Sequence, residues 1–501
     1  MSKVLGIDFG MTNYCVAVIE NNNPLTIPSA EGLRTTPCEV AFSKNHFSLV
    51  GVHAKHAIAD AQMSVISSVR RRLGTSYEWA VGSNMYSATD VAKIIFQKIK
   101  NDSETFLKEK IEQAVLTVPT YFSSHSIGAL VSACKSAGID VIGTIQEPVA
   151  ATLAYGMNNS SKELILVCHL GGCSFNATVL SISNKEICVL ATSPEYYIGG
   201  NSFDKRIVDY LTDAFLQKSH IDVKSDKSAM KRITNEAERI KIELSENKEV
   251  TINLPFLSAN ANGPQSLNTI LSRQTFETLI SDIIQHTTII ANDTIRDAKI
   301  SKHDLTKILL VGGMARVPAV QRAMNNFAGR SVFLGRNPDE CYAIGAAKYA
   351  KKIQTSTQNR TVSKGESIMY DVVLSFAGEE RNYVEQVAYE LKKRNVKVFY
   401  DKDEQSILWG ENLYEKLSDI YRSAHFCVVF VSKNYARKRW TRHELRSAEA
   451  RAFEEKSGYI LPALFDDTEI SGILPTTGYI DLRITSPYAL ADAICQKLTL
   501  K

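Results

Sequence analysis

Two distant stretches of this chain repeat one pattern: an apolar strand, a glycine-containing turn and a second apolar strand. The first is KVLGIDFGMTNYCVAVIE at residues 3–20, and the second is ELILVCHLGGCSFNATVLSI at residues 163–182. Helical stretches such as ATDVAKIIFQKIKNDSETFL alternate with these blocks. A supersecondary unit that recurs in this way predicts an internally duplicated α/β domain with one hairpin turn in each half.

Composition excludes several classes of protein. The 501 residues exceed what one hydrophobic core supports, so two or three domains are expected. A net charge of +4 is small for this length, and we therefore expect no nucleic-acid partner. Nine scattered cysteines without a CxxC pair are typical of reduced thiols. The start MSKVLGIDFG resembles no secretory signal, and no run of about 18 apolar residues occurs, so we predict a cytoplasmic protein with no membrane partner.

A polar segment divides the chain. Residues 354–367 read QTSTQNRTVSKGES and predict a linker between a domain at 1–353 and a domain at 368–501. In the second domain, strands are predicted at Asp371–Ser375, Val396–Tyr400, Phe426–Ser432, Tyr459–Phe465 and Tyr479–Leu482. Helices are predicted near Asn382–Arg394, Glu411–Arg422, Arg442–Glu455 and Pro487–Leu498. This alternation predicts a parallel, doubly wound sheet with its site at the carboxyl ends of the strands.

The two glycine-containing turns are suited to phosphate. In GIDFGMTN, Gly6 and Gly10 permit a tight hairpin whose backbone amides, with the hydroxyl of Thr12, can surround an anion. Gly171 and Gly172, followed by Ser174, repeat the arrangement. No GK[ST] follows, so this is not a Walker loop. A single glycine-rich hairpin is usually only a turn, but a pair of them favours a nucleotide site.

A series of motifs covering Met1–Ile353 resembles the nucleotide-binding domain of the seventy-kilodalton heat-shock chaperones, within the actin-like ATPase superfamily. In order, these motifs are GIDFGMTNYCVAV, EGLRTTPCEVAF, AVLTVPTYF, IQEPVAATLAYG, HLGGCSFNATV, IGGNSFD, ERIKIELS, ILLVGGMARVPAV and NPDECYAIGAA. The resemblance implies ATP or ADP as ligand, with Mg²⁺ reached by Asp8 through water. It implies that the phosphates are held by Gly10, Thr12, Asn13, Gly171, Gly172 and Ser174. It implies that the adenosine is framed by Glu238, Lys241, Ser245, Gly312, Gly313, Arg316 and Asp339.

Departures from that family's pattern bear on catalysis. Glu147 matches the carboxylate of the catalytic region, but Arg70 stands at the position of the catalytic lysine. His169 and Asn176 stand where the family has aspartates, and Met11 replaces the leading threonine of the first turn. Metal ions and attacking water need anionic oxygen ligands. We therefore predict that nucleotide binds and that its hydrolysis is slow or absent.

A further departure concerns coupling to a peptide-binding domain. The proline of the family's interdomain relay is kept as Pro119, whereas Ile127 replaces its arginine. This pattern favours a nucleotide-responsive domain that no longer signals to a peptide-binding half. The alternative is drift in a degenerate, purely structural domain.

The second domain resembles a Toll/interleukin-1 receptor (TIR) domain of the bacterial type, with a flavodoxin-like parallel sheet. The resemblance rests on YDVVLSFAGEER, ILWGENLYEKL and VVFVSKNYARKRWTRHELRSA. In enzymatic relatives a tryptophan precedes the catalytic glutamate by four residues, and Trp440 and Glu444 have this spacing, which puts both on one helix face. The resemblance implies NAD⁺ as substrate and Glu444 as catalytic residue, with NAD⁺ contacts from Phe376, Ala377, Trp409 and Trp440.

One carboxylate can suffice for this chemistry. Cleavage of NAD⁺ at the nicotinamide–ribose bond expels a neutral leaving group, so no second carboxyl group is needed to protonate it. The plainer alternatives are that Glu444 complements a helix dipole, that Trp440 packs, and that the surrounding basic residues are solvated surface.

Together these features predict an NAD⁺ glycohydrolase effector regulated by a chaperone-like nucleotide sensor. The predicted partners are other TIR domains, through self-association, and a protein trigger sensed by the first domain. The family association implies antiphage immunity by NAD⁺ depletion. The alternative is a non-enzymatic TIR adaptor with a nucleotide-binding regulatory domain.

Overall fold

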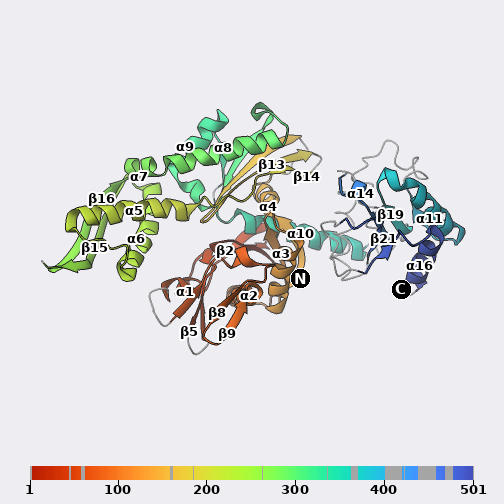
Figure 1. Ribbon diagram of the computed structural model, residues 1–501, viewed down its shortest axis with the longest axis horizontal. Helices are drawn as coiled ribbons and strands as arrows, with labels where there is room; N and C mark the ends of the chain where they lie inside the picture. The colour runs from red at the N-terminus through yellow and green to blue at the C-terminus, as the bar shows by residue number, and fades with distance from the viewer. Residues whose placement is uncertain are drawn as a thin grey trace. The chain divides into compact units, whose positions relative to one another are not determined.

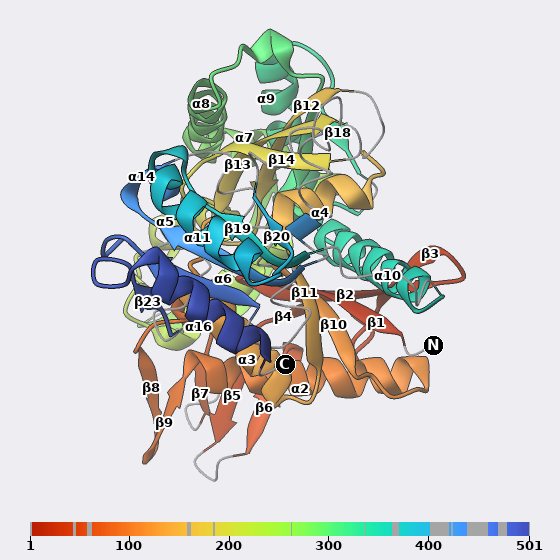
Figure 2. The ribbon, with the colours of Figure 1, turned by 90° about the vertical axis from the view of Figure 1, so that its right-hand side faces the viewer.

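A computed structural model describes residues 3–43, 47–57, 63–157, 162–183, 186–261, 263–335, 337–362, 370–400, 420–421, 424–437, 459–468 and 478–499 (Figures 1 and 2). Its contacts divide the chain into two compact units, Met1–Gln354 and Thr355–Lys501. Each unit is described by itself below. No helix among the described residues combines the length and the apolar character needed to cross a membrane.

Unit 1 contains two sheets with the same topology. In sheet order, the first consists of β11 (Asp140–Gln146), β10 (Gln113–Val118), β1 (Val4–Phe9), β2 (Asn13–Glu20) and β3 (Asn23–Ile27), with β4 (Thr35–Pro37) beside β2. The second consists of β18 (Phe333–Leu334), β17 (Lys307–Val311), β12 (Glu163–Leu170), β13 (Phe175–Ser183) and β14 (Glu186–Thr192). In each sheet the first three long strands form an antiparallel meander. Two further strands, parallel to the first strand of the meander, extend the sheet on its other side. The duplicated α/β domain predicted from the sequence is confirmed.

Two helices lie between the sheets (Figure 1). They are α4 (Glu147–Ala154) and α10 (Cys341–Val362), and their apolar side chains share one core with strands of both sheets. The packing is close because glycines face backbone: a Cβ at Gly6 would lie 2.2 Å from the amide nitrogen of Ala347. At Gly345 a Cβ would lie 1.9 Å from the carbonyl oxygen of Ala150. These contacts join the two halves of unit 1 behind the hairpin turns.

The outer faces carry longer helices and small sheets. The first half adds α1 (Val52–Ala57), α2 (Ala88–Leu107), α3 (Ser124–Ser136), the strands β5 (Val40–Ser43), β6 (Ser48–Val50) and β7 (Met63–Ile66), and the hairpin β8 (Glu78–Val81) to β9 (Asn84–Ser87). The second half adds α5 (Gly200–Ser219), α6 (Lys227–Glu246), α7 (Arg273–Leu279), α8 (Ser281–Asp297), α9 (Pro318–Ala328), and the hairpin β15 (Glu249–Asn260) to β16 (Gly263–Ser272). Helix α2 shows the local logic: Ser87 and Asp90 form a reciprocal capping box at its start, and its buried residues recur at helical spacing.

Unit 2 is a parallel sheet with the flavodoxin-like strand order. In sheet order its strands are β20 (Val398–Phe399), β19 (Tyr370–Ser375), β21 (Ala424–Val431), β22 (Ile460–Leu464) and β23 (Ile480–Asp481). Helices α11 (Arg381–Lys393) and α16 (Pro487–Thr499) pack on one face of the sheet, and the short α14 (Lys433–Arg437) follows β21. The predicted doubly wound parallel sheet is confirmed.

Some element limits differ from the sequence-based expectations. Helix α10 continues to Val362, through the first part of the segment predicted as a linker. The predicted helix at Arg442–Glu455 lies outside the described residues. Of the one predicted near Glu411–Arg422, the structure describes Ile420 and Tyr421, which are helical.

Candidate functional site

The two glycine-containing turns of unit 1 lie against each other. Each is closed by a backbone hydrogen bond, from Gly10 N to Asn13 O at 3.0 Å and from Gly171 N to Ser174 O at 2.9 Å. A Cβ at Gly172 would lie 2.6 Å from Thr12 Oγ1, so only glycine allows the turns to approach this closely. The fold therefore brings together two segments that lie about 160 residues apart in the sequence.

The second turn also meets the start of helix α5. Gly200 N donates to Gly171 O at 3.0 Å, and Asn201 N donates to Gly172 O at 2.7 Å. A Cβ at Gly199 would lie 2.8 Å from Gly171 O, which leaves no room for a side chain. The first two amides of α5 are used in these bonds, so this helix start adds the positive end of its dipole beside the second turn, which favours a phosphate there. The sequence reasoning gave these residues no role, although the GG of IGGNSFD was the available signal.

Behind the turns lies a buried ion pair. Arg70 Nη1 donates to Glu147 Oε1 at 2.5 Å and to the carbonyl oxygen of Phe9 at 3.3 Å. Both charged side chains are nearly inaccessible, with residue exposures of 4% for Arg70 and 6% for Glu147. Arg70 reaches this position from a 3₁₀ helix at Val69–Arg72, and Glu147 opens α4.

Asp8 shares this charged cluster. Its Oδ1 accepts a hydrogen bond from Thr117 Oγ1 at 2.7 Å. Burial raises the pKa of Asp8 to about 7, and the charge of Glu147 acts in the same direction, while Arg70 and the Thr117 hydrogen bond oppose it. A carboxylate oxygen is the type of ligand that Mg²⁺ prefers, so Asp8 fits a hydrated magnesium ion carried by a nucleotide.

The two residues that replace family aspartates have different surroundings. His169 lies one residue before the end of β12, and its ring lies 5.1 Å from that of Tyr342 in an edge-on arrangement. Burial lowers the pKa of His169, although Glu147 opposes this, so the imidazole is neutral at pH 7.

Asn176 is held by a hydroxyl network. Its Nδ2 donates to Ser193 O at 2.7 Å, and its Oδ1 accepts from Thr178 Oγ1 at 3.0 Å. A carboxylate at this position has no proton to donate to the Ser193 carbonyl. The amide therefore fits its neighbours better than the aspartate of the family pattern.

The residues predicted to frame adenosine come from α6, from the segment after β17 and, for Asp339, from the segment before α10. Several are engaged in ion pairs: Lys241 Nζ lies 2.7 Å from Asp204 Oδ2, and Arg316 Nη2 lies 2.6 Å from Asp339 Oδ1. Gly312 has φ of 91° and donates its amide to Pro338 O at 2.8 Å, and Ser245 Oγ donates to Lys241 O. A Cβ at Gly313 would meet no atom within 4 Å.

Glu238 joins the two halves of unit 1. Its Oε2 lies 2.6 Å from Lys55 Nζ, and this pair connects α6 with α1. At the relay positions, Pro119 O accepts the amide of Phe122, and Ile127 packs against the core of the first half.

Unit 2 places two of the predicted NAD⁺ contacts at the carboxyl end of β19. Phe376 stacks on Tyr400 with ring centroids 5.7 Å apart, and the guanidinium carbon of Arg381 lies 5.2 Å above the Phe376 ring. Ala377 is buried. Trp409, Trp440 and Glu444 lie outside the described residues.

Polar side chains that the sequence reasoning missed converge at the same sheet edge. Glu380 Oε1 accepts hydrogen bonds from Ser432 Oγ at 2.7 Å and from Asn434 Nδ2 at 3.1 Å. The hydroxyl oxygens of Ser375 and Tyr435 lie 2.7 Å apart. The signal for this cluster was its place after β19 and β21, since strands adjacent in a parallel sheet end at one edge.

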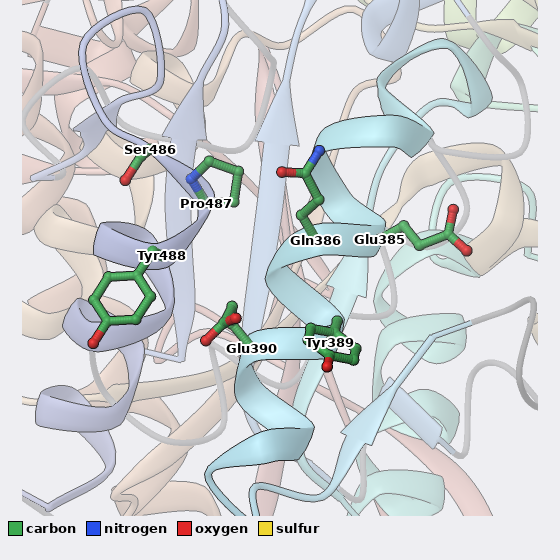
Figure 3. A pocket seen from close by; sticks show the side chains of 7 residues that line it. All are labelled: Glu385, Gln386, Tyr389, Glu390, Ser486, Pro487 and Tyr488. Atoms are coloured by element: carbon green, nitrogen blue, oxygen red, sulfur yellow. The ribbon is translucent and has the colours of Figure 1, made fainter.

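A groove runs between α11 and α16 on the face of unit 2 away from the sheet (Figure 3). It has a volume of about 530 Å³. Tyr389, with 66% exposure, and Tyr488, with 58%, lie on its two sides. Arg394 Cζ lies 4.5 Å from the Tyr488 ring, so part of this aromatic surface is covered by a cation–π contact.

Comparison with known families assigns the two units. The family model described as Hsp70 protein matches residues 4–85 and 78–396. The family model described as TIR domain matches residues 372–498. The matches overlap at 372–396, where β19 pairs with β20 and β21, so these residues belong by their contacts to the parallel sheet of unit 2.

Proposed function

The chain belongs to the Hsp70 protein family, with an Hsp70-like nucleotide-binding domain followed by a TIR domain, and from this premise we propose that it is a nucleotide-regulated effector that cleaves NAD⁺. The first domain acts as the sensor and the TIR domain acts as an NAD⁺ glycohydrolase of the bacterial type. Depletion of NAD⁺ in an infected cell is the proposed outcome, as part of antiphage immunity.

The observation that carries the enzymatic proposal is the polar cluster at the sheet edge of unit 2. The strand order places a topological switch point between β19 and β21, and ligands of doubly wound sheets bind in the crevice at such a point. Glu380 follows β19, and Ser432 and Asn434 follow β21, so polar groups from both sides meet there. Trp440 and Glu444 follow α14 in the sequence, and we propose them as the stacking residue and the catalytic carboxylate.

The proposed reaction is a simple substitution at the ribose. The bond between ribose C1′ and the nicotinamide nitrogen breaks, and its electron pair leaves with nicotinamide, which becomes neutral. Water adds at C1′ and loses a proton, which gives ADP-ribose. Glu444 stabilises the positive charge that develops on the ribose, and Trp440, Phe376, Ala377 and Trp409 line the dinucleotide site.

The proposed ligand of the sensor is ATP or ADP, held at the paired turns and the start of α5. The residues fit the phosphates, because the turns supply backbone amides and the hydroxyls of Thr12 and Ser174. Mg²⁺ bound near Asp8 would neutralise phosphate charge. Hydrolysis is proposed to be slow, since Arg70 is paired with Glu147 and neither His169 nor Asn176 carries a carboxylate.

The direct experiment compares NAD⁺ in cells that express the full chain or its Glu444→Ala variant, under infection. We expect NAD⁺ to fall with the wild type and to stay at the level of uninduced cells with the variant. Chromatography of NAD⁺ incubated with purified protein, with and without ATP, identifies the product and the effect of the nucleotide. Equal NAD⁺ levels in both strains, with no nicotinamide released in vitro, would remove the enzymatic proposal.

The groove between α11 and α16 favours a second candidate, a non-enzymatic TIR adaptor. Aromatic side chains such as Tyr389 and Tyr488 are enriched at protein interfaces relative to the rest of the surface. Under this reading Tyr389→Asp abolishes function and self-association measured by light scattering, while Glu444→Gln leaves both intact. The enzymatic proposal predicts that Glu444→Gln alone already removes activity.

A further inference from the structure

The side chain of Glu380 bridges two loops at the switch point of the TIR sheet. This residue ends the 3₁₀ helix Gly378–Glu380 that follows β19, and the residues that it contacts, Ser432 and Asn434, follow β21. Glu380 occupies the N-cap position of α11, yet its side chain forms no capping hydrogen bond there. Its carboxylate therefore joins the segments that follow β19 and β21 and does not cap the helix start.

Only one carboxylate oxygen is used in these contacts. Oε1 accepts both hydrogen bonds, from the Ser432 hydroxyl and the Asn434 amide. Oε2 is buried, and among the residues that the structure describes no donor reaches it. A buried carboxylate oxygen without a donor costs free energy, so its presence calls for an explanation such as a bound water, ion or ligand.

The start of α14 is fixed without any contribution from Oε2. Ser432 Oγ accepts the amide of Tyr435 at 3.1 Å, and Asp466 Oδ2 accepts the amide of Lys433 at 3.0 Å. The Tyr435 hydroxyl shares a hydrogen bond with the Ser375 hydroxyl. Because these contacts and Oε1 position the turn, a purely structural role for Glu380 leaves its second oxygen unexplained.

We propose that Glu380 Oε2 accepts a hydrogen bond from a ribose hydroxyl of the dinucleotide, which makes Glu380 a second acidic residue of the TIR site. This inference rests on the proposed function and adds a residue to it. A ribose supplies hydroxyl donors, and a carboxylate bonded to a ribose hydroxyl strengthens its hold as positive charge develops on the sugar. Glu380 thereby positions the sugar, and Glu444 keeps the catalytic role.

The test uses Glu380→Gln in the full chain, with ADP-ribose as the probe because it carries the ribose and is not cleaved. The glutamine oxygen can keep the bonds from Ser432 and Asn434, while its NH₂ group replaces Oε2, so the negative charge is lost and this atom can no longer accept the proton of the ribose hydroxyl. Calorimetry is expected to give a roughly tenfold to hundredfold higher Kd for ADP-ribose. The Tm is expected to stay within about 2 °C of the wild type.

The matched control is Glu379→Gln, an exposed glutamate one position earlier, which is expected to leave the Kd unchanged. An unchanged Kd in Glu380→Gln, or a wild type that binds no ADP-ribose, overturns the inference. An equal loss of affinity for free nicotinamide overturns the assignment to ribose. Binding is measured without turnover, so failure of the NAD⁺ cleavage assay and failure of this inference remain distinguishable.

Discussion

Replacing Arg70 by methionine is expected to destabilise unit 1 strongly. The guanidinium of Arg70 is the partner of a carboxylate whose residue is 6% exposed, and its charge also opposes the raised pKa of Asp8. Methionine fills much of the same volume without charge, so the main effect is electrostatic. Removing one member of a buried ion pair costs about 3–5 kcal/mol, because the remaining charge has lost its partner.

A double-mutant cycle isolates the pair. Arg70→Met leaves Glu147 without its partner, whereas Glu147→Gln leaves the arginine beside Asp8. We expect the double variant to be more stable than the sum of the single losses predicts, with an interaction energy of at least about 2 kcal/mol. The pair lies 2.5 Å apart and out of water, in contrast to surface pairs that contribute about 0–1 kcal/mol.

The assay is urea unfolding of the full chain, followed by hydrogen exchange in peptides that cover β1 and β10, since these strands report on unit 1 alone. Peptides from β19 and β21 serve as the internal control and are expected to be unaffected. Single losses that simply add, with an interaction energy below about 1 kcal/mol, would refute the reasoning. They would mean that water reaches the ion pair and screens it.

Three further predictions follow from contacts in unit 1. Burial raises the pKa of Asp8 from 3.8 to about 7, so the ionised carboxylate destabilises the folded protein at pH 8, and this cost disappears below pH 4 where Asp8 is protonated. Asp8→Asn is therefore expected to raise the free energy of unfolding by up to about 4 kcal/mol at pH 8 and to change it little at pH 4. Urea titrations at both pH values measure this difference. Lys55→Ala removes a half-exposed pair that spans α1 and α6, and is expected to speed release of a fluorescent ADP analogue up to about fivefold in stopped flow. Asn176→Asp restores the family residue but loses the donor to Ser193 O, and is expected to lower stability by about 1–3 kcal/mol in thermal unfolding, whereas improved stability would contradict the network described.

The fold was predictable because its signals are local. The repeated strand–turn–strand blocks lie within 18 and 20 residues, and alternating strands and helices after residue 369 are enough to indicate a parallel sheet. The limits of α10 were not predictable, since polar residues such as those of QTSTQNRTV do not forbid a helix. Propensity is a weak guide where no apolar face marks the end of an element.

The composition of the site was predictable only in part. The turns containing Thr12 and Gly172 stood out because glycine and hydroxyl residues repeat at matching places. The sequence also pointed to Arg70 as unusual, but not to its pairing with Glu147, which lies 77 residues away. For Glu380 the sequence offered only its place after the first strand of the second domain, which is a weak signal because an acidic residue between elements is ordinarily solvated.

By itself, the sequence determined which residue types stand at each position: two glycine turns, an arginine and an amide in place of a lysine and an aspartate, and a TIR pattern after an Hsp70-like domain. Only the tertiary structure decided which charges are paired and which are left without a donor. Coulomb energy and desolvation depend on distance and on burial, and both are fixed by how strands distant in sequence come together in a sheet. The same functional group, a glutamate carboxylate, is therefore a counterion at Glu147 and a candidate ligand-binding group at Glu380.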